Sequence, residues 1–359
     1  MVTAPTPPEP LPRPALDSHT HLDMIALPVD DVMATARAAG ILRAVTVGTT
    51  LESSHWSARC AAEHDGVYAA VAIHPNDTEG VPETVLAEIE ALAARPRVVA
   101  VGETGLDYYR DHAAPDVQRW WFREHIKIAK RTGKALMIHD REAHADILRI
   151  LEQEGPPARV VFHCFSGDAP MVKQCAEAGY VMSFAGNVTF TNAQPLRDAA
   201  AAAPPDLLLA ETDAPFLTPV PNRGRPNEPA QVAYTLRCLA EVQGLDLAEF
   251  CDTVTATADR TFGPWLCPRL TRPCGCSLPR TSGPSPSGWA CGPRSGSGRT
   301  SWWNRARYAG SRRWPRRVPA TWCWRSGRGS ARSRSPCSRP GPGGSWRSRS
   351  TGCSRPNCR

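Results

Sequence analysis

Eight short apolar runs alternate with stretches of helical periodicity along residues 15–263, and this alternation constrains the fold more than any other feature of the sequence. Apolar strands separated by helices indicate parallel strands buried on both faces, because the crossover helices cover the outside of the sheet. Eight such units in about 250 residues predict a (β/α)8, or TIM, barrel, and a doubly wound open sheet is the structural alternative. The predicted strands are Ala15–His19, Ala44–Gly48, Tyr68–His74, Val98–Gly102, Ala135–His139, Val160–His163, Tyr180–Phe184 and Leu207–Glu211.

The stretches between these strands carry apolar residues at helical spacing, which places them on one face of a helix. They predict amphipathic helices that cover the barrel. Examples are Leu86, Ile89 and Leu92, then Val117, Trp121 and Ile128, then Ile147, Leu148 and Leu151.

Histidines and acids gather at the carboxyl ends of the predicted strands, where the active sites of TIM barrels lie. His19 and His21 stand two apart in the extended segment 16–23, so their imidazoles point to the same face. Imidazoles with carboxylates suit Zn²⁺, Mn²⁺ or Mg²⁺, so the pattern predicts a metal site. The full set is His19, His21, His74, Glu103, His139, His163 and Asp213. The other five histidines fall in helices or loops, and we interpret them as solvated or capping side chains: His55, His64, His112, His125 and His144.

Six segments of the chain resemble the TatD family of metal-dependent DNases, in the family's order and context. The resemblance covers about residues 16–263. A further element, Arg225–Pro229, is similar to the family's Arg-Asn-Glu-Pro sequence with Pro226 inserted. The six segments are Asp17–Asp23, Ala72–Pro75, Val101–Tyr108, Ile138–Arg141, Phe162–Gly167 and Glu211–Pro215.

The resemblance implies a site for two divalent metal ions, Mg²⁺, Mn²⁺ or Zn²⁺. One ion would be held by His19, His21 and Asp213, the other by His139 and His163, with Glu103 as the bridge. A carboxylate has two oxygens and can span ions about 3.5 to 4 Å apart. No lysine ends the fourth strand, so Glu103 is the candidate bridge.

We expect this site to hydrolyse phosphodiester bonds, with activated water attacking phosphorus in line. Glu103 and Asp213 are the expected catalytic carboxylates, and Asp213 is a candidate acceptor of the water proton. His74 has no place in the implied metal shell, so we interpret it as a phosphate contact or leaving-group donor. Weaker candidates for substrate binding are Arg141 and Arg223 for phosphates and Tyr108 and Tyr109 for base stacking, with Asp107 orienting a ligand or capping a loop.

The charge of the chain changes abruptly near residue 264. Residues 1–263 hold 22 Lys and Arg against 35 Asp and Glu, a net charge of −13. Residues 264–359 hold 20 Arg and no Lys or acid, a net charge of +20. A body of this negative charge argues against wrapping duplex DNA over a basic surface, so we expect a single-stranded substrate or a DNA end.

These differences predict three regions: a flexible leader over residues 1–14, which hold seven prolines or acids, the hydrolase barrel over 15–263, and a tail over 264–359. The Arg/Ser/Pro/Gly-rich tail has no Ile, Phe or Met, so we expect disorder. We interpret the tail as out-of-frame translation of a GC-rich gene.

The five cysteines before residue 264 are widely spaced, which favours free thiols in a reducing compartment. No apolar run is long enough for a membrane span. We therefore expect a cytoplasmic monomer that binds DNA and no membrane. Two rival functions stay open: a barrel metal hydrolase acting on amide or ester bonds, and a nucleic-acid-binding protein acting through its basic tail.

Overall fold

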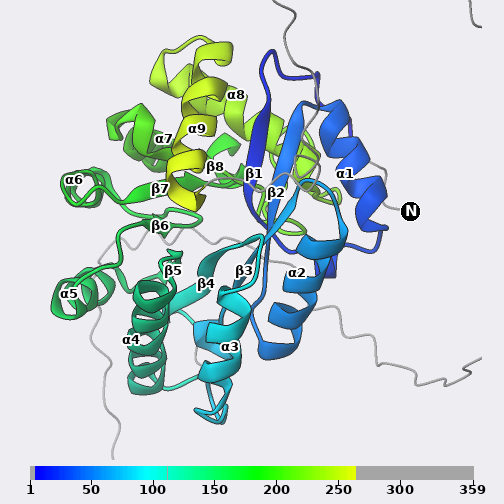
Figure 1. Cartoon of the computed structure of the whole chain (residues 1–359). Helices are drawn as coiled ribbons and strands as arrows, with labels where there is room; N and C mark the ends of the chain where they lie inside the picture. The colour runs from blue at the N-terminus through cyan, green and yellow to red at the C-terminus, as the bar shows by residue number, and fades with distance from the viewer. Residues whose placement is uncertain (1–4, 111, 264–359) are drawn as a thin grey trace, which may run out of the picture. The chain divides into compact units, whose positions relative to one another are not determined.

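The structure, a computed structural model, describes residues 5–110 and 112–263, and these form an eight-stranded parallel barrel. Each strand pairs with the next one along the chain, in the order β1 to β8 (Figure 1). The strands are β1 (Ala15–Thr20), β2 (Ile41–Val47), β3 (Val67–Val71), β4 (Val98–Asp107), β5 (Ala135–Arg141), β6 (Val160–Phe162), β7 (Val181–Phe184) and β8 (Leu208–Ala210).

The barrel closes between β1 and the segment that follows β8. Thr20 and Ala214 form a parallel bridge. The His21 amide donates to the Ala214 carbonyl at 2.7 Å, and the Asp213 amide donates to the His19 carbonyl at 3.0 Å. This closure confirms the predicted TIM barrel and excludes the doubly wound alternative.

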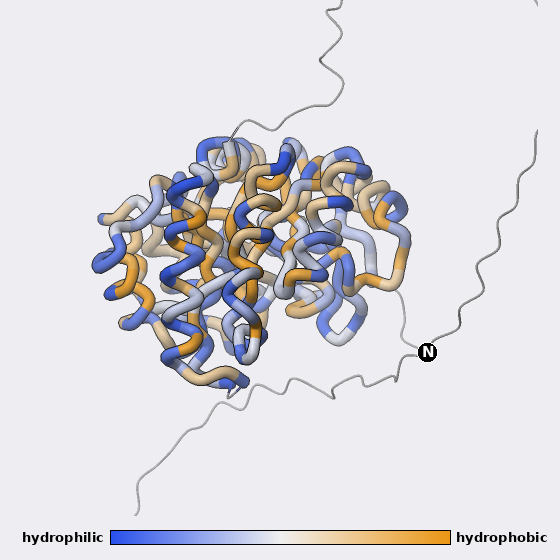
Figure 2. Tube along the Cα trace, turned by 60° about the horizontal axis from the view of Figure 1, so that its bottom comes forward, coloured by the Kyte–Doolittle hydropathy of each residue, from blue (hydrophilic) through white to orange (hydrophobic). Residues whose placement is uncertain are grey.

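Helices surround the strands and bury their apolar faces against them (Figure 1). Figure 2 shows hydrophobic segments running through the centre and hydrophilic ones lying around the outside. The predicted amphipathic stretches are confirmed as α3, α4 and α5. The helices are α1 (Val29–Ala38), α2 (Leu51–Glu63), α3 (Val85–Ala93), α4 (Pro115–Thr132), α5 (His144–Glu154), α6 (Ala169–Glu177), α7 (Gln194–Ala202), α8 (Val232–Gln243) and α9 (Leu247–Phe262).

Strand β4 differs most from its prediction, because it continues five residues beyond Gly102 to Asp107. Its register against β5 shifts between Val101 and Thr104. Pairing then resumes with Thr104 opposite Ile138 and continues with Gly105 opposite His139. Gly105 has φ +143°, and a Cβ there would lie 2.0 Å from the His139 carbonyl oxygen. The glycine therefore permits the close approach that brings β4 against the metal-ligand candidate of β5.

Residues 5–14 lie against the barrel, and the flexibility expected for the leader over residues 1–14 stays a prediction. Thr6 exchanges two hydrogen bonds of 2.8 Å with the side chain of Asn222. Leu11 is buried in the core, and its amide donates to the Ala39 carbonyl. Proline restricts the backbone before folding, so a segment rich in it loses little entropy when it docks.

The predicted tail lies outside the described residues, so its disorder and its out-of-frame origin stay predictions. The five cysteines before residue 264 are free, as expected. Among the described residues, none of the helices combines the length and apolarity needed to cross a bilayer.

Candidate metal centre

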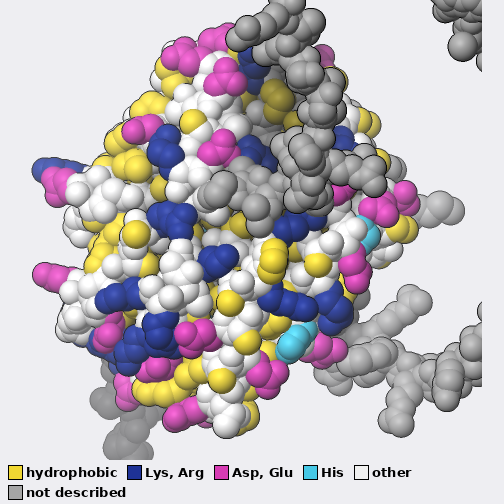
Figure 3. Space-filling model, viewed as in Figure 1, with side chains coloured by type: hydrophobic (Ala, Val, Ile, Leu, Met, Phe, Trp, Pro, Cys, Tyr) yellow, Lys and Arg dark blue, Asp and Glu magenta, His cyan; other side chains and the backbone are white. Residues whose placement is uncertain are grey.

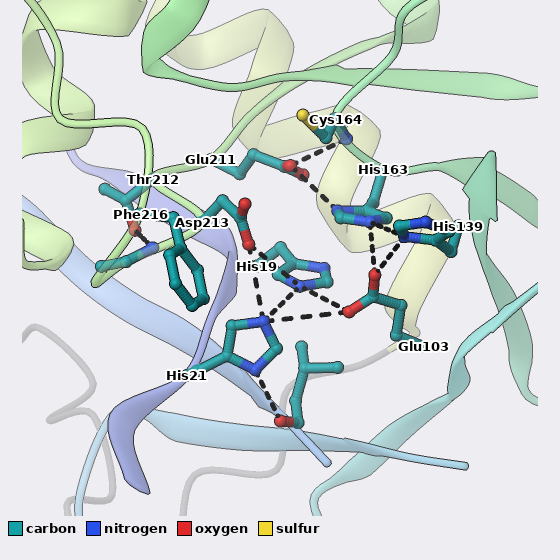
Figure 4. Close-up of polar contacts among 12 residues, drawn as sticks. His19, His21, Glu103, His139, His163, Cys164, Glu211, Thr212, Asp213 and Phe216 are labelled. Atoms are coloured by element: carbon teal, nitrogen blue, oxygen red, sulfur yellow. Dashed lines mark hydrogen bonds and ion pairs between the residues drawn. The ribbon is translucent and has the colours of Figure 1, made fainter. Parts of the chain in front are cut away.

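The seven residues predicted from strand ends converge at one end of the barrel. Figure 4 shows six of them: His19, His21, Glu103, His139, His163 and Asp213. His19 and His139 lie in β1 and β5, and Glu103 lies in the extended part of β4. The others follow strands directly or by a few residues: His21, His74, His163 and Asp213. Their nitrogen and oxygen atoms form three overlapping groups whose members lie within 4.8 Å of one another.

The first donor group, His19, His21 and Asp213, surrounds one oxygen of Glu103. Glu103 Oε2 lies 3.4 Å from His19 Nε2 and 3.8 Å from His21 Nε2. Asp213 Oδ1 lies 3.7 Å from His19 Nε2 and 3.5 Å from His21 Nε2. Four donor atoms from three parts of the barrel thus enclose a space of the size that a cation needs.

The second donor group, His74, His139 and His163, surrounds the other oxygen of the same carboxylate. Glu103 Oε1 lies 2.6 Å from His139 Nδ1, 2.8 Å from His163 Nε2 and 3.4 Å from His74 Nε2. His74 Nε2 is also 3.3 Å from His139 Nδ1. The structure therefore places His74 beside the implied ligands, although the family resemblance assigned it no place among them.

The electrostatics of the site fit a cation. Burial alone would raise the pKa of Glu103, but His163, His74 and His139 lower it well below its usual range. Burial alone would lower the pKa of His21, yet the Asp213 carboxylate raises it to about 9. Imidazoles and carboxylates are the ligands that divalent ions take in proteins, and an ion bound here would replace the proton that His21 holds.

Several donors are oriented by groups behind them. The Nδ1 of His21 donates to the Val47 carbonyl at 3.0 Å, which turns Nε2 toward the site. Asp107 Oδ2 lies 3.3 Å from His139 Nε2, while Asp107 Oδ1 accepts the amides of Tyr109 and Arg110. Asp107 thus contacts His139 and also caps a loop, so the two alternatives predicted for it are compatible with each other.

Glu211 is an orienting residue that the sequence analysis did not assign. It is fully buried, and its Oε1 lies 3.2 Å from His163 Nδ1 and accepts the Cys164 amide at 2.8 Å (Figure 4). Its Oε2 has no hydrogen-bond partner among the described residues. An acid one residue beyond β8, two positions before Asp213, was the signal that could have revealed it.

The segment that carries Asp213 is fixed by buried polar groups. Asp17 accepts hydrogen bonds from both the amide and the hydroxyl of Thr212. Asn227 donates to the carbonyls of Thr212 and Phe216. Asn227 belongs to the Arg225–Pro229 element, so this element holds the chain around Asp213 in place.

The match of the chain to a known protein family shows which family it belongs to. Residues 16–263 match the profile of the family described as TatD related DNase. The chain belongs to this family. The predicted resemblance is thereby confirmed over the barrel.

Proteins similar to this TatD family member are named as metal-dependent hydrolases. A protein from Mycobacterium tuberculosis, named "Uncharacterized metal-dependent hydrolase TatD", is 46% identical over 257 residues, covering 69% of this chain and 97% of that protein. The metal-dependent hydrolase YabD of Bacillus subtilis is 38% identical, covering 68% of this chain and 98% of its own. The crystal structure of YjjV, a TatD homologue from Escherichia coli, superposes with a TM-score of 0.66 at 28% identity, covering 69% of this chain and 97% of that one. The chain is thus a TatD family metal-dependent hydrolase.

The predicted substrate contacts occupy different places on the barrel. The Arg141 guanidinium lies over the exposed ring of Tyr109, 4.1 Å from its centroid. Tyr108 is half-buried, and its hydroxyl donates to Asp146 at 2.6 Å. Arg223 lies over the ring of Phe190 at 4.2 Å. Of the two tyrosines, Tyr109 is the one whose ring is open to solvent.

His125 is fully buried, so its interpretation as a solvated or capping side chain is wrong. Its Nε2 accepts the Ile73 amide at 3.3 Å, and its Nδ1 lies 2.9 Å from the Thr104 hydroxyl. Burial lowers the pKa of His125 to about 4. Trp121, four residues earlier in α4, is also buried, and this spacing placed His125 on the inner face.

Proposed function

We propose that this TatD family hydrolase is a deoxyribonuclease that cleaves phosphodiester bonds of single-stranded DNA or DNA ends with two divalent ions. One observation carries the proposal: the two oxygens of Glu103 face different donor groups, at 3.4 Å from His19 and 2.6 Å from His139. A carboxylate arranged in this way can bridge two ions.

The donor types suit Mg²⁺, Mn²⁺ or Zn²⁺. Bound ions would supply a water of lowered pKa and would offset charge on the phosphoryl oxygens. His19, His21 and Asp213 would hold one ion and His139 and His163 the other, with Glu103 between them. The orienting contacts of His21, His139 and His163 keep their donor atoms pointed inward before any ion binds.

Three further side chains have proposed roles in the chemistry and the binding of substrate. Asp213 is partly accessible at the mouth, so its carboxylate can take the proton of the attacking water. His74 is the member of the second donor group that is not assigned to an ion, and it can contact the phosphate or donate to the leaving oxygen. Arg141 is proposed to bind a phosphate, and Tyr108, or its exposed neighbour Tyr109, to contact the substrate.

The charge of the barrel supports a single strand or an end over a broad duplex contact. Residues 1–263, which include the barrel, carry a net charge of −13. On the face shown in Figure 3, basic side chains are interspersed with acidic ones. Binding that depends on the donor groups and a few arginines needs no extended basic surface. A cytoplasmic, monomeric enzyme is part of this proposal.

The test is a substrate panel for the full chain, stripped of metal and reloaded with Mg²⁺, Mn²⁺ or Zn²⁺. We expect cleavage of a single-stranded oligonucleotide that requires metal and exceeds cleavage of a blunt duplex. Metal-dependent hydrolysis of a lactone or an amide, without cleavage of DNA, would instead support the second candidate, a hydrolase of amide or ester bonds. The rival in which the basic tail is the functional part lies outside the described residues.

A further inference from the structure

Among the residues that the structure describes, most of the large exposed apolar side chains lie at the end of the barrel that carries the candidate metal centre. Six large apolar side chains are exposed among residues 5–110 and 112–263, and five of them lie in loops that follow strands. Leu42, near the start of β2, is the exception. The five are Met24, Leu27, Tyr109, Phe216 and Val220. Solvent-exposed apolar groups beside a catalytic centre indicate a surface for binding.

These residues divide between opposite sides of the barrel mouth. Met24 and Leu27 follow β1, and Phe216 and Val220 follow β8, which is the neighbour of β1 where the barrel closes. We call these four residues the apolar rim. Strands β4 and β5 stand four places away in a ring of eight, so the loops after them lie across the mouth. Tyr109, Arg110 and Arg141, from the ends of β4 and β5, form what we call the basic rim.

Phe216 is presented rigidly at the edge of the first donor group. The residue is 41% exposed, and its ring centroid lies 6.3 Å from that of His21 (Figure 4). The Phe216 amide donates to the Asp213 carbonyl at 2.8 Å, and the buried side chain of Asn227 donates to the Phe216 carbonyl. An exposed aromatic ring on a fixed backbone loses little entropy when a flat partner stacks on it.

The basic rim is fixed in a comparable way. Asp107 Oδ1 accepts the amides of Tyr109 and Arg110 at 3.0 and 2.9 Å, which sets the direction of the loop. Arg141 lies over the Tyr109 ring. Arg110 follows Tyr109 in this loop, and its guanidinium is attracted by the carboxylates of Asp107, Glu103 and Asp213. Two guanidinium groups on this side are complementary to phosphate oxygens.

We propose that a single-stranded nucleic acid crosses the mouth with an unpaired base stacked on Phe216 and a neighbouring phosphate bound by Arg110 and Arg141. The scissile phosphate then lies over Glu103, between the two rims. This inference rests on the proposed nuclease function and deepens it. Stacking on Phe216 requires a base with a free face, so a base inside an intact duplex is excluded from this position.

The test combines Phe216 variants with an oligonucleotide in which one abasic residue is moved along the strand. Stacking of one base contributes enough affinity for Phe216→Ala to weaken binding of oligo(dT) about 5- to 150-fold. Binding is measured by fluorescence anisotropy of the full chain in EDTA, and cleavage as kcat/KM after metal is restored. Because every variant carries the same arginine-rich tail, its contribution cancels between variants.

Phe216→Trp should retain binding, and Leu42→Ala, which removes an exposed apolar side chain at the other end of the barrel, should leave it unchanged. In the wild type, we expect kcat/KM to fall when the abasic residue occupies the position that stacks on Phe216. In Phe216→Ala the same abasic residue should cause no further loss, because the stacking contact is already absent. Arg110→Ala and Arg141→Ala should each make binding less dependent on salt. In a plot of the logarithm of the binding constant against the logarithm of the salt concentration, the slope should become about 0.7 smaller, the value for one phosphate contact.

The outcomes separate this inference from the nuclease proposal. If both proteins cleave single strands, and kcat/KM depends on the position of the abasic residue in the same way in the wild type and in Phe216→Ala, the stacking role alone is overturned. If binding of single strands depends on Phe216 but no cleavage occurs, the proposed binding across the two rims is kept and the proposed nuclease activity is overturned. A wild-type protein that neither binds nor cuts single strands would overturn both.

Discussion

The two donor groups on either side of Glu103 keep their negative charge in different places. In the first group the Asp213 carboxylate lies among the donors, and His21 is backed by the neutral Val47 carbonyl. In the second group all three donors are imidazoles, and the acids stand behind two of them. Asp107 contacts His139, and Glu211 contacts His163.

This difference indicates how each group would hold an ion. A carboxylate among the donors neutralises cation charge directly. A carboxylate behind an imidazole raises the basicity of the ring and fixes its direction. The second group therefore depends on residues that would not touch the ion, and we expect it to be the more sensitive to substitutions outside the donor set.

The backbones beneath the two groups are anchored by different chemistry as well. On the first side, the Asp17 carboxylate accepts two hydrogen bonds from Thr212, next to Asp213. On the second side, His125 accepts the amide of Ile73, next to His74, and contacts Thr104, next to Glu103. One anchor is an acid and the other is a base, so acidification should act on them differently.

The largest expected effect comes from Glu103, which belongs to both groups. We predict that Glu103→Gln loses both ions and reduces kcat on the best substrate by about 10³-fold or more, since ion-based charge stabilisation contributes several kcal/mol. Metal content by mass spectrometry and kcat at saturating metal measure the two effects. Glu88→Gln, an exposed site on α3, is the matched control. Full activity of Glu103→Gln would overturn the shared carboxylate and with it the division into two groups.

The apolar pattern was sufficient to predict the strands, and the strand ends led to the seven residues that converge at the candidate site. Runs such as Val98–Gly102 and Ala135–His139 are buried on both faces, and the residues at their ends were recognisable as donors without knowledge of side-chain positions. The extension of β4 to Asp107 was not predictable in this way, because Gly102 and Gly105 normally mark the end of a strand. Their function here depends on the distance to β5, which only the folded chain defines.

The orienting residues were harder to predict than the donors. Glu211 and Asp17 act through contacts with residues 48 and 195 positions away in the chain, at His163 and Thr212. No local pattern contains such a pairing. His125 is a different case. Its spacing from Trp121 indicates burial, whereas its polar side chain favours exposure, and in the structure the spacing decides.

The anchor of the second group gives a prediction for stability at low pH. With Nε2 of His125 accepting the Ile73 amide, a proton on Nε2 would face an N–H group, and burial lowers the pKa of His125 to about 4. The unfolded chain binds this proton near pH 6.5. Stability is therefore fully present above pH 6.5 and is lost as the pH falls toward 4, because the unfolded state then binds more protons.

Urea unfolding of the wild type and of His125→Gln, from pH 7 to pH 4, tests this prediction. Over that range the free energy of unfolding of the wild type should fall by about 3 kcal/mol more than that of the variant. Other groups titrate in both proteins and cancel in the difference. Parallel pH profiles would show that His125 does not supply a pH-dependent anchor on this side.

The smallest expected effect bears most directly on the contrast between the two groups. Glu211→Gln keeps a carbonyl oxygen for the Cys164 amide but removes the charge behind His163, so one ion should be held about 10- to 100-fold more weakly while the other is unaffected. Asp107→Asn should weaken the binding of the same ion. Burial would raise the pKa of Asp107, but hydrogen bonds with His139 and Asn76 hold it below its usual range. The substitution therefore removes the negative charge behind His139. Calorimetric titration of the metal-free protein distinguishes the two ions by their affinities. Equal weakening of both would mean that the charge of Glu211 acts on the centre as a whole, and the two groups would then have to be treated as one.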